Sequence, residues 1–212
     1  TKSGGNEFSG SVRDSLSNDK WTAVTPVNNT RLSKVNPVYE GTLGGRIIRD
    51  RLWFFFAGRD AKTSNSTPFA SAQPDFQQSF TQPNHEKRAE AKLSAAITAK
   101  HNFTLTGMHV DAPQINIPFG SDYEAISLEP SRNVPLGFYT AHYNGVLTDN
   151  FLLEGLFSKK TLIFEGGGGA LGDLAHATPI LDLVNNSWYG FPVFCGTCGH
   201  EYRNNKYYDA KA

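Results

Sequence analysis

The sequence contains no run of eighteen consecutive apolar residues, which excludes a transmembrane helix. Methionine occurs once, and leucine and alanine never repeat with a period near 3.6 over three turns, so nothing predicts long helices. Lysine plus arginine equals aspartate plus glutamate at 20 each, and no basic cluster occurs, so we expect no nucleic-acid partner. Two cysteines are too few to complete a zinc ribbon.

Strand-forming features are present instead. Glycine occurs 20 times and aromatic residues make up 12% of the chain, which favours an all-β protein. The clearest alternation runs from residue 86 to 98. There one face is apolar (Ala89, Ala91, Leu93, Ala95, Ile97) and the other is polar (Arg88, Glu90, Lys92, Ser94, Thr98).

Short and long connections alternate along the chain. The short ones are residues 49–51, 100–102 and 148–150, and the long polar ones are residues 16–40, 61–85, 111–135 and 165–206. Between them we predict strands at 6–15, 41–48, 52–60, 86–98, 103–110, 136–147 and 151–164, with an eighth that begins near Tyr207.

A soluble β-sandwich would also show alternation, so strand length and loop asymmetry decide between the two folds. Strands of about ten residues match the length that a tilted strand needs to cross a bilayer. Because only every second residue faces lipid, a mean hydropathy of −0.40 is compatible with a membrane. We therefore predict an antiparallel up-and-down transmembrane β-barrel, with about eight strands of a larger barrel in this chain.

Aromatic residues flank the predicted short turns. Trp53, Phe54, Phe103 and Phe151 lie beside these turns, where aromatic rings favour the membrane interface. The alternative is that aromatic residues simply favour strands.

The last long connection holds the candidate binding and redox residues. Cys195 and Cys198 are expected to form a loop disulfide, with unpaired thiols or a metal site completed by His200 and His176 as alternatives. Trp188, Tyr189 and Phe191 are candidates for stacking on a sugar or another flat ligand, or they fold back on their own loop.

The predicted lumen wall offers little chemistry. His142 and Asn144 fall on its polar side, but no serine shares that face of the strand, so a barrel hydrolase is the weakest hypothesis. Arg88, Glu90 and Lys92 have the mixed signs of a hydrogen-bonded wall. We predict no catalytic residue, no cofactor and no resident metal.

Three segments carry a family resemblance. Residues 1–11 (TKSGGNEFSGS) resemble the end of the plug and the first barrel strand of Oar-like TonB-dependent receptors. Residues 41–55 (GTLGGRIIRDRLWFF) resemble the second strand, first periplasmic turn and third strand of that family. Residues 143–150 (YNGVLTDN) are similar to a later joint between a strand and a turn.

This resemblance implies an outer-membrane transporter of about twenty-two strands, filled by an N-terminal plug and powered by the TonB system. Residues 1–5 would be the end of the plug, and residues 6–212 would be the first part of the barrel. The chain begins at Thr1 without an initiator methionine or a signal peptide, so we interpret it as a fragment or a processed piece.

The expected function is gated uptake of a solute across a bacterial outer membrane, without enzymatic chemistry. Long extracellular loops would capture the solute, which could be a small molecule, a glycan or a peptide. The expected partners are outer-membrane lipid and, through the region upstream, the TonB system. A surface adhesin or structural barrel is the first alternative, and a barrel hydrolase is the second.

Overall fold

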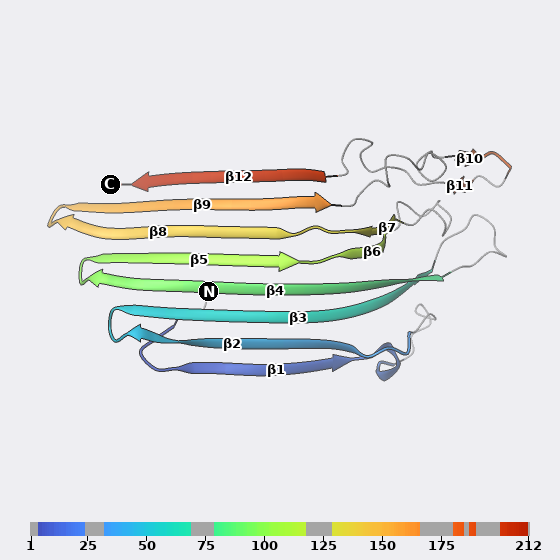
Figure 1. Ribbon diagram of the computed structural model, residues 1–212, viewed down its shortest axis with the longest axis horizontal. Coiled ribbons are helices and arrows are strands. Elements are labelled where there is room, and N and C mark those ends of the chain that lie inside the picture. Colours follow the sequence, from blue (N-terminus) through green and yellow to red (C-terminus); the bar gives the residue numbers. More distant parts are fainter. Residues whose placement is uncertain are drawn as a thin grey trace.

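A computed structural model describes residues 4–23, 32–68, 79–117, 129–165, 180–184, 187–189 and 200–211. Its main feature is an antiparallel sheet in which eight strands lie side by side in chain order (Figure 1). These strands are β1 (Ser9–Ser17), β2 (Asn36–Ile48), β3 (Leu52–Pro68), β4 (Ser79–Thr98), β5 (His101–Asp111), β8 (Leu136–Thr148), β9 (Phe151–Glu165) and β12 (His200–Lys211).

Smaller elements lie in the long connections. A 3₁₀ turn, η1 (Asp19–Trp21), follows β1. In the connection from β5 to β8, β6 (Gln114–Ile117) pairs with both β4 and β7 (Glu129–Arg132). Strands β10 (Ile180–Asp182) and β11 (Ser187–Tyr189) form a separate hairpin. The described part of the chain holds no helix with the length and apolar character of a membrane span.

The three predicted short turns are present, although the second lies at 99–100 instead of 100–102, and all lie at one end of the sheet, which we call the turn side (Figure 1). Each hairpin has the same irregularity two residues before its turn. The register shifts there, and the extra residues are large, apolar and exposed (Ile47, Ile97 and Leu147). At the first turn Asp50 has a φ of 59°, a left-handed conformation that aspartate tolerates.

The hairpins are staggered along the strand direction. Leu52, the first residue of β3, pairs with Ala95, three residues before β4 ends at Thr98. His101 pairs with Gly145, three residues before β8 ends at Thr148. Each turn therefore protrudes further than the one before it, as the stepped turn ends in Figure 1 show. Such a stagger is what strand tilt in a closed barrel requires.

Most strands are longer than predicted, except the first, which is predicted at 6–15 and runs from Ser9 to Ser17. The predicted loop 61–85 is wrong in large part, because β3 and β4 stay paired as far as Pro68 and Ser79. Strand β2 likewise begins at Asn36 instead of Gly41, and the eighth strand begins at His200 instead of near Tyr207. Beyond the apolar band, serine, threonine and asparagine occupy both faces of β3. Apolar and polar residues therefore no longer alternate there, although the backbone remains paired with β4.

The sheet has almost no protein interior. Among the described residues Ala61 is the single buried hydrophobic one, whereas Val12, Leu43 and Phe56 are 93%, 51% and 49% exposed. A soluble sandwich would cover such side chains with a second sheet. A continuous exposed apolar face over paired strands fits a transmembrane barrel, in which lipid covers that face. The predicted fold class is confirmed, and the unclosed sheet is part of a barrel.

Candidate functional site

The register sorts the side chains into rows that alternate between the two faces of the sheet. We call the apolar face the outward face; one of its rows is Gly10, Leu43, Phe56, Ala91, Gly107 and Tyr139. We call the other the lumen face; the adjacent row there is Ser11, Thr42, Ala57, Glu90, Met108 and Phe138. The lumen face is the candidate functional surface, since a solute passing through a barrel contacts only that face.

Ion pairs cross four strands of the lumen face. Arg13 of β1 lies 3.9 Å from Glu40 of β2, and Arg59 of β3 lies 3.5 Å from Glu40 and 3.3 Å from Glu86 of β4. Arg88 and Glu90 form a further pair along β4. The predicted hydrogen-bonded wall is thus confirmed for Arg88 and Glu90.

Five of these side chains line a hollow of about 400 Å³ between β1 and β4, namely Arg13, Glu40, Arg59, Arg88 and Glu90. Together with Glu86, which pairs with Arg59, the ion pairs join three arginines (Arg13, Arg59, Arg88) to three glutamates (Glu40, Glu86, Glu90). The side chains are partly exposed, from 33% to 73%, so each pair contributes at most about 1 kcal/mol. These six side chains are polar, and their formal charges sum to zero.

The segment before β1 is fixed to the first hairpin through Asn6. The side-chain oxygen of Asn6 accepts hydrogen bonds from the Trp53 indole at 2.8 Å and from the Asp50 backbone N–H at 3.0 Å. Its amide group also donates to the Asp50 carboxylate, and its backbone carbonyl accepts a bond from Arg46 at 3.0 Å. Arg46 and Trp53 pair directly on the lumen face. The chain therefore reaches β1 across the lumen face of β2 and β3.

Gly4 continues this path against the backbone of the sheet. A methyl group added at Gly4 would overlap the carbonyl oxygen of Phe54, whereas one added at Gly5 would meet nothing within 4 Å. Gly44 lies beneath Gly4, because a methyl group built on it would approach the Gly4 Cα to 3.5 Å. Glycine at position 4 permits this close approach.

A His–Glu pair lies on the lumen face nearer the turn side. His142 is on that face, as predicted, and its Nε2 lies 2.9 Å from Glu154 Oε1. This partner cannot be predicted from the pattern of one strand, because the contact depends on the register between β8 and β9. Among the described residues no serine or threonine hydroxyl bonds to His142, so the pair lacks the nucleophile of a hydrolase.

The predicted belt of aromatic residues is only partly correct. Phe54 and Phe103 lie in rows of the outward face. Phe151 lies an even number of residues from the outward residues of β9, so it faces the same side. Trp53 does not join them, since it lies on the lumen face and bonds to Asn6. Adjacent residues of a strand point to opposite faces, so Trp53 and Phe54 cannot belong to one belt.

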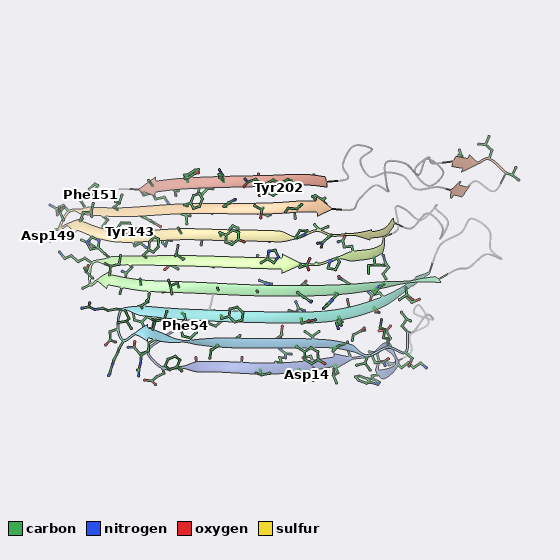
Figure 2. The ribbon with its side chains drawn as sticks, in the orientation of Figure 1. Asp14, Phe54, Tyr143, Asp149, Phe151 and Tyr202 are labelled. Atoms are coloured by element: carbon green, nitrogen blue, oxygen red, sulfur yellow. The ribbon has the colours of Figure 1, made fainter. Side chains whose placement is uncertain are left out.

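Two tyrosines of β8 mark the two edges of the outward face. The ring of Tyr139 lies over Gly137, toward the loop side, and the ring of Tyr143 lies over Gly145, toward the turn side. The Tyr143 hydroxyl lies 2.7 Å from His101 Nδ1. Figure 2 places Tyr143 near the turn end of β8, with Asp149 and Phe151 at the turn itself.

The positions covered by the two rings, Gly137 and Gly145, are eight residues apart, about 27 Å along a strand. At a tilt of roughly 40°, this distance corresponds to about 20 Å of membrane thickness, close to the height of a barrel's apolar band. Tyrosine hydroxyls at both edges, in contact with water or head groups, are typical of such a band.

The remaining predicted residues lie in the last connection. Trp188 and Tyr189 belong to β11, where their backbones pair with Leu181 and Ile180 of β10. Phe191, Cys195 and Cys198 lie outside the described residues, and so does His176. Ligand stacking and the disulfide therefore stay predictions.

The comparisons with known proteins agree with this geometry. Residues 1–79 match a family model described as an outer membrane beta barrel domain. The matched region spans β1, β2 and β3, including the Asn6 contacts and most of the charged hollow. Searches among curated proteins and among solved structures gave no significant match. The chain is part of a β-barrel protein of the bacterial outer membrane.

Proposed function

We propose that this protein is a TonB-dependent transporter, in which long extracellular loops capture a solute and a plug gates its passage through the barrel. In this proposal residues 1–5 end the plug and residues 6–212 form the first part of the barrel. The resemblance to Oar-like receptors in residues 1–11 and 41–55 supports this assignment.

The observation that carries the proposal is the path of residues 4–6. Asn6 is held by Arg46 and Trp53 on the lumen face, and Gly4 lies against the backbone of β2 and β3 on the same side. A chain that enters its first strand from the lumen places whatever precedes it inside the barrel. A barrel filled by an N-terminal domain needs this arrangement, whereas an empty pore or an adhesin does not.

The charged wall supports the same proposal. Because Arg13, Arg59 and Arg88 are already paired with glutamates, a plug packed against them would not leave unpaired charges when it moved. The six ion-paired side chains, whose formal charges sum to zero, also do not favour one sign of solute. Such a surface fits a plug that must rearrange in each transport cycle.

The rival functions have less support. A surface adhesin would use the same strands, but it gives no reason for the lumen path of residues 4–6. A hydrolase would need a nucleophile beside His142. Its Nε2 already contacts Glu154, and no hydroxyl group of the described residues bonds to it.

The test uses the full-length protein in its own cells. Removing the region upstream of Gly4 should unblock the barrel and make cells sensitive to vancomycin, which intact outer membranes exclude. The intact protein should confer no such sensitivity. Uptake of solutes from culture medium, compared by mass spectrometry, should require the intact protein and an energised inner membrane. Unchanged vancomycin resistance after the deletion, with the barrel still folded, would contradict the proposal.

A further inference from the structure

Two lysines face each other on the outward face. Lys159 of β9 and Lys206 of β12 are directly paired in the register, and Lys159 pairs on its other side with Tyr139. Within the described strands no carboxylate forms an ion pair with either lysine. Like charges directly opposite each other destabilise a sheet, so this arrangement calls for an anion.

Lys87 provides the contrast. It also lies on the outward face, but its cross-strand partners are Asp60 on β3 and Asp111 on β5. The register thus places an acid on either side of this outward lysine and leaves the other two lysines side by side.

The height of the lysines places them at the outer edge of the apolar band. Lys159 lies eight residues beyond Phe151, the first residue after its turn, which is about 20 Å of membrane thickness at a tilt of roughly 40°. Tyr139, its neighbour, extends toward the loop side over Gly137. A lysine at the centre of the bilayer would be costly, but at this height its ammonium group reaches the lipid head groups.

An apolar hollow lies directly below the lysine pair, toward the turn side. Phe157 and Tyr208 form the next pair along β9 and β12, with ring centroids 5.1 Å apart. They flank a hollow of about 540 Å³ whose floor is formed by the small residues Ala141, Gly155 and Ala210. A methyl group added at Gly155 would meet no atom within 4 Å, so this floor is open.

We propose that Lys159 and Lys206 bind the phosphate of an outer-leaflet glycolipid, lipid A, and that the hollow at Gly155 receives one of its acyl chains. Two ammonium groups side by side supply donors and positive charge for a phosphate. The apolar hollow lies where the acyl chain below that phosphate would run. This site rests on the membrane placement of the sheet and is independent of transport.

The experiment measures lipid binding to the full-length protein in detergent micelles by native mass spectrometry. The probes are bisphosphorylated lipid A, the same lipid after removal of both phosphates, and inorganic phosphate. The double variant Lys159→Gln/Lys206→Gln should bind bisphosphorylated lipid A at least tenfold more weakly. Lys160→Gln is the matched control, because it removes an adjacent charge from the lumen face and should bind like the unchanged protein.

A second variant tests the hollow separately. Gly155→Leu fills the floor without removing a charge, and it should also weaken lipid A binding several-fold. A difference in gel migration between unheated and boiled samples shows that each variant is folded. Equal binding by the double variant and the Lys160→Gln control would overturn the proposal. Equal binding of dephosphorylated lipid A, or an equally strong complex with inorganic phosphate, would overturn it too.

Discussion

The indole of Trp53 donates a hydrogen bond of 2.8 Å to the side-chain oxygen of Asn6, which joins the segment before the first strand to the lumen face of the first hairpin. The same oxygen accepts a bond from the Asp50 backbone, in the turn of that hairpin. This side chain therefore helps to hold the entering segment on the lumen face of the sheet.

Replacing Asn6 with alanine should release this segment. The variant loses the side-chain bonds to Trp53 and Asp50, which together contribute about 1–3 kcal/mol to holding the segment in place. Amide hydrogen exchange of residues 4–8 should accelerate by one to two orders of magnitude, while exchange in β4 and β5 should not change. The neighbouring substitution Glu7→Ala is the control, and equal exchange in the two variants would contradict the role of Asn6.

A methyl group at Gly4 should have a different effect from one at Gly5. Gly4→Ala places the new methyl group against the carbonyl oxygen of Phe54, so the segment must leave the sheet, whereas Gly5→Ala meets open space. The fluorescence of Trp53 should shift to longer wavelength in Gly4→Ala as water reaches the indole. The same shift in Gly5→Ala, or none in either, would be inconsistent with the described path.

The glycine under Tyr143 should tolerate no side chain. A methyl group at Gly145 would collide with the Tyr143 hydroxyl, so the ring must turn away and lose its 2.7 Å contact with His101. We expect Gly145→Ala to lower the free energy of unfolding by about 1–2 kcal/mol. Gly155→Ala on the next strand, where the space is open, should change it by less than about 0.5 kcal/mol. Urea unfolding in lipid vesicles measures both values.

The lumen ion pairs should contribute modestly and unequally. Arg59 contacts both Glu40 and Glu86, whereas Arg13 contacts Glu40, at 3.9 Å, and no other carboxylate in the part of the chain that the structure describes. We expect Arg59→Gln to destabilise the barrel by about 1 kcal/mol and Arg13→Gln by less than half of that, because these side chains are partly exposed. The same unfolding assay distinguishes them, and raising the salt concentration should reduce the difference.

Sequence patterns predicted the part of the fold that the membrane imposes. Alternation from Ala89 to Ile97 follows from lipid on one side and water on the other, and the short turns follow from hairpin geometry, so these features are visible in one strand at a time. Beyond the membrane, both faces of a strand can contact water, so the sequence no longer needs to alternate between apolar and polar residues. The paired extensions of β3 and β4 to Pro68 and Ser79 have no alternation that would reveal them.

The contacts between strands could not be predicted in this way. The pairing of His142 with Glu154 and of Lys159 with Lys206 depends on register across two strands. Lys206 was moreover expected in a loop. The Asn6 contacts also reach back from an irregular segment to a later hairpin, which no local pattern encodes.

Spin labels along β4 test most directly whether the outward face of the sheet contacts lipid. Single nitroxide labels at positions 88 to 95 of the full-length protein in lipid bilayers can be probed for collision with oxygen, which concentrates in lipid, and with a water-soluble nickel chelate. We predict alternation with a period of two, in which labels at 89, 91, 93 and 95 respond to oxygen and those at 88, 90, 92 and 94 respond to nickel. Labels at 91 and 93 that respond only to nickel would contradict a lipid-facing sheet.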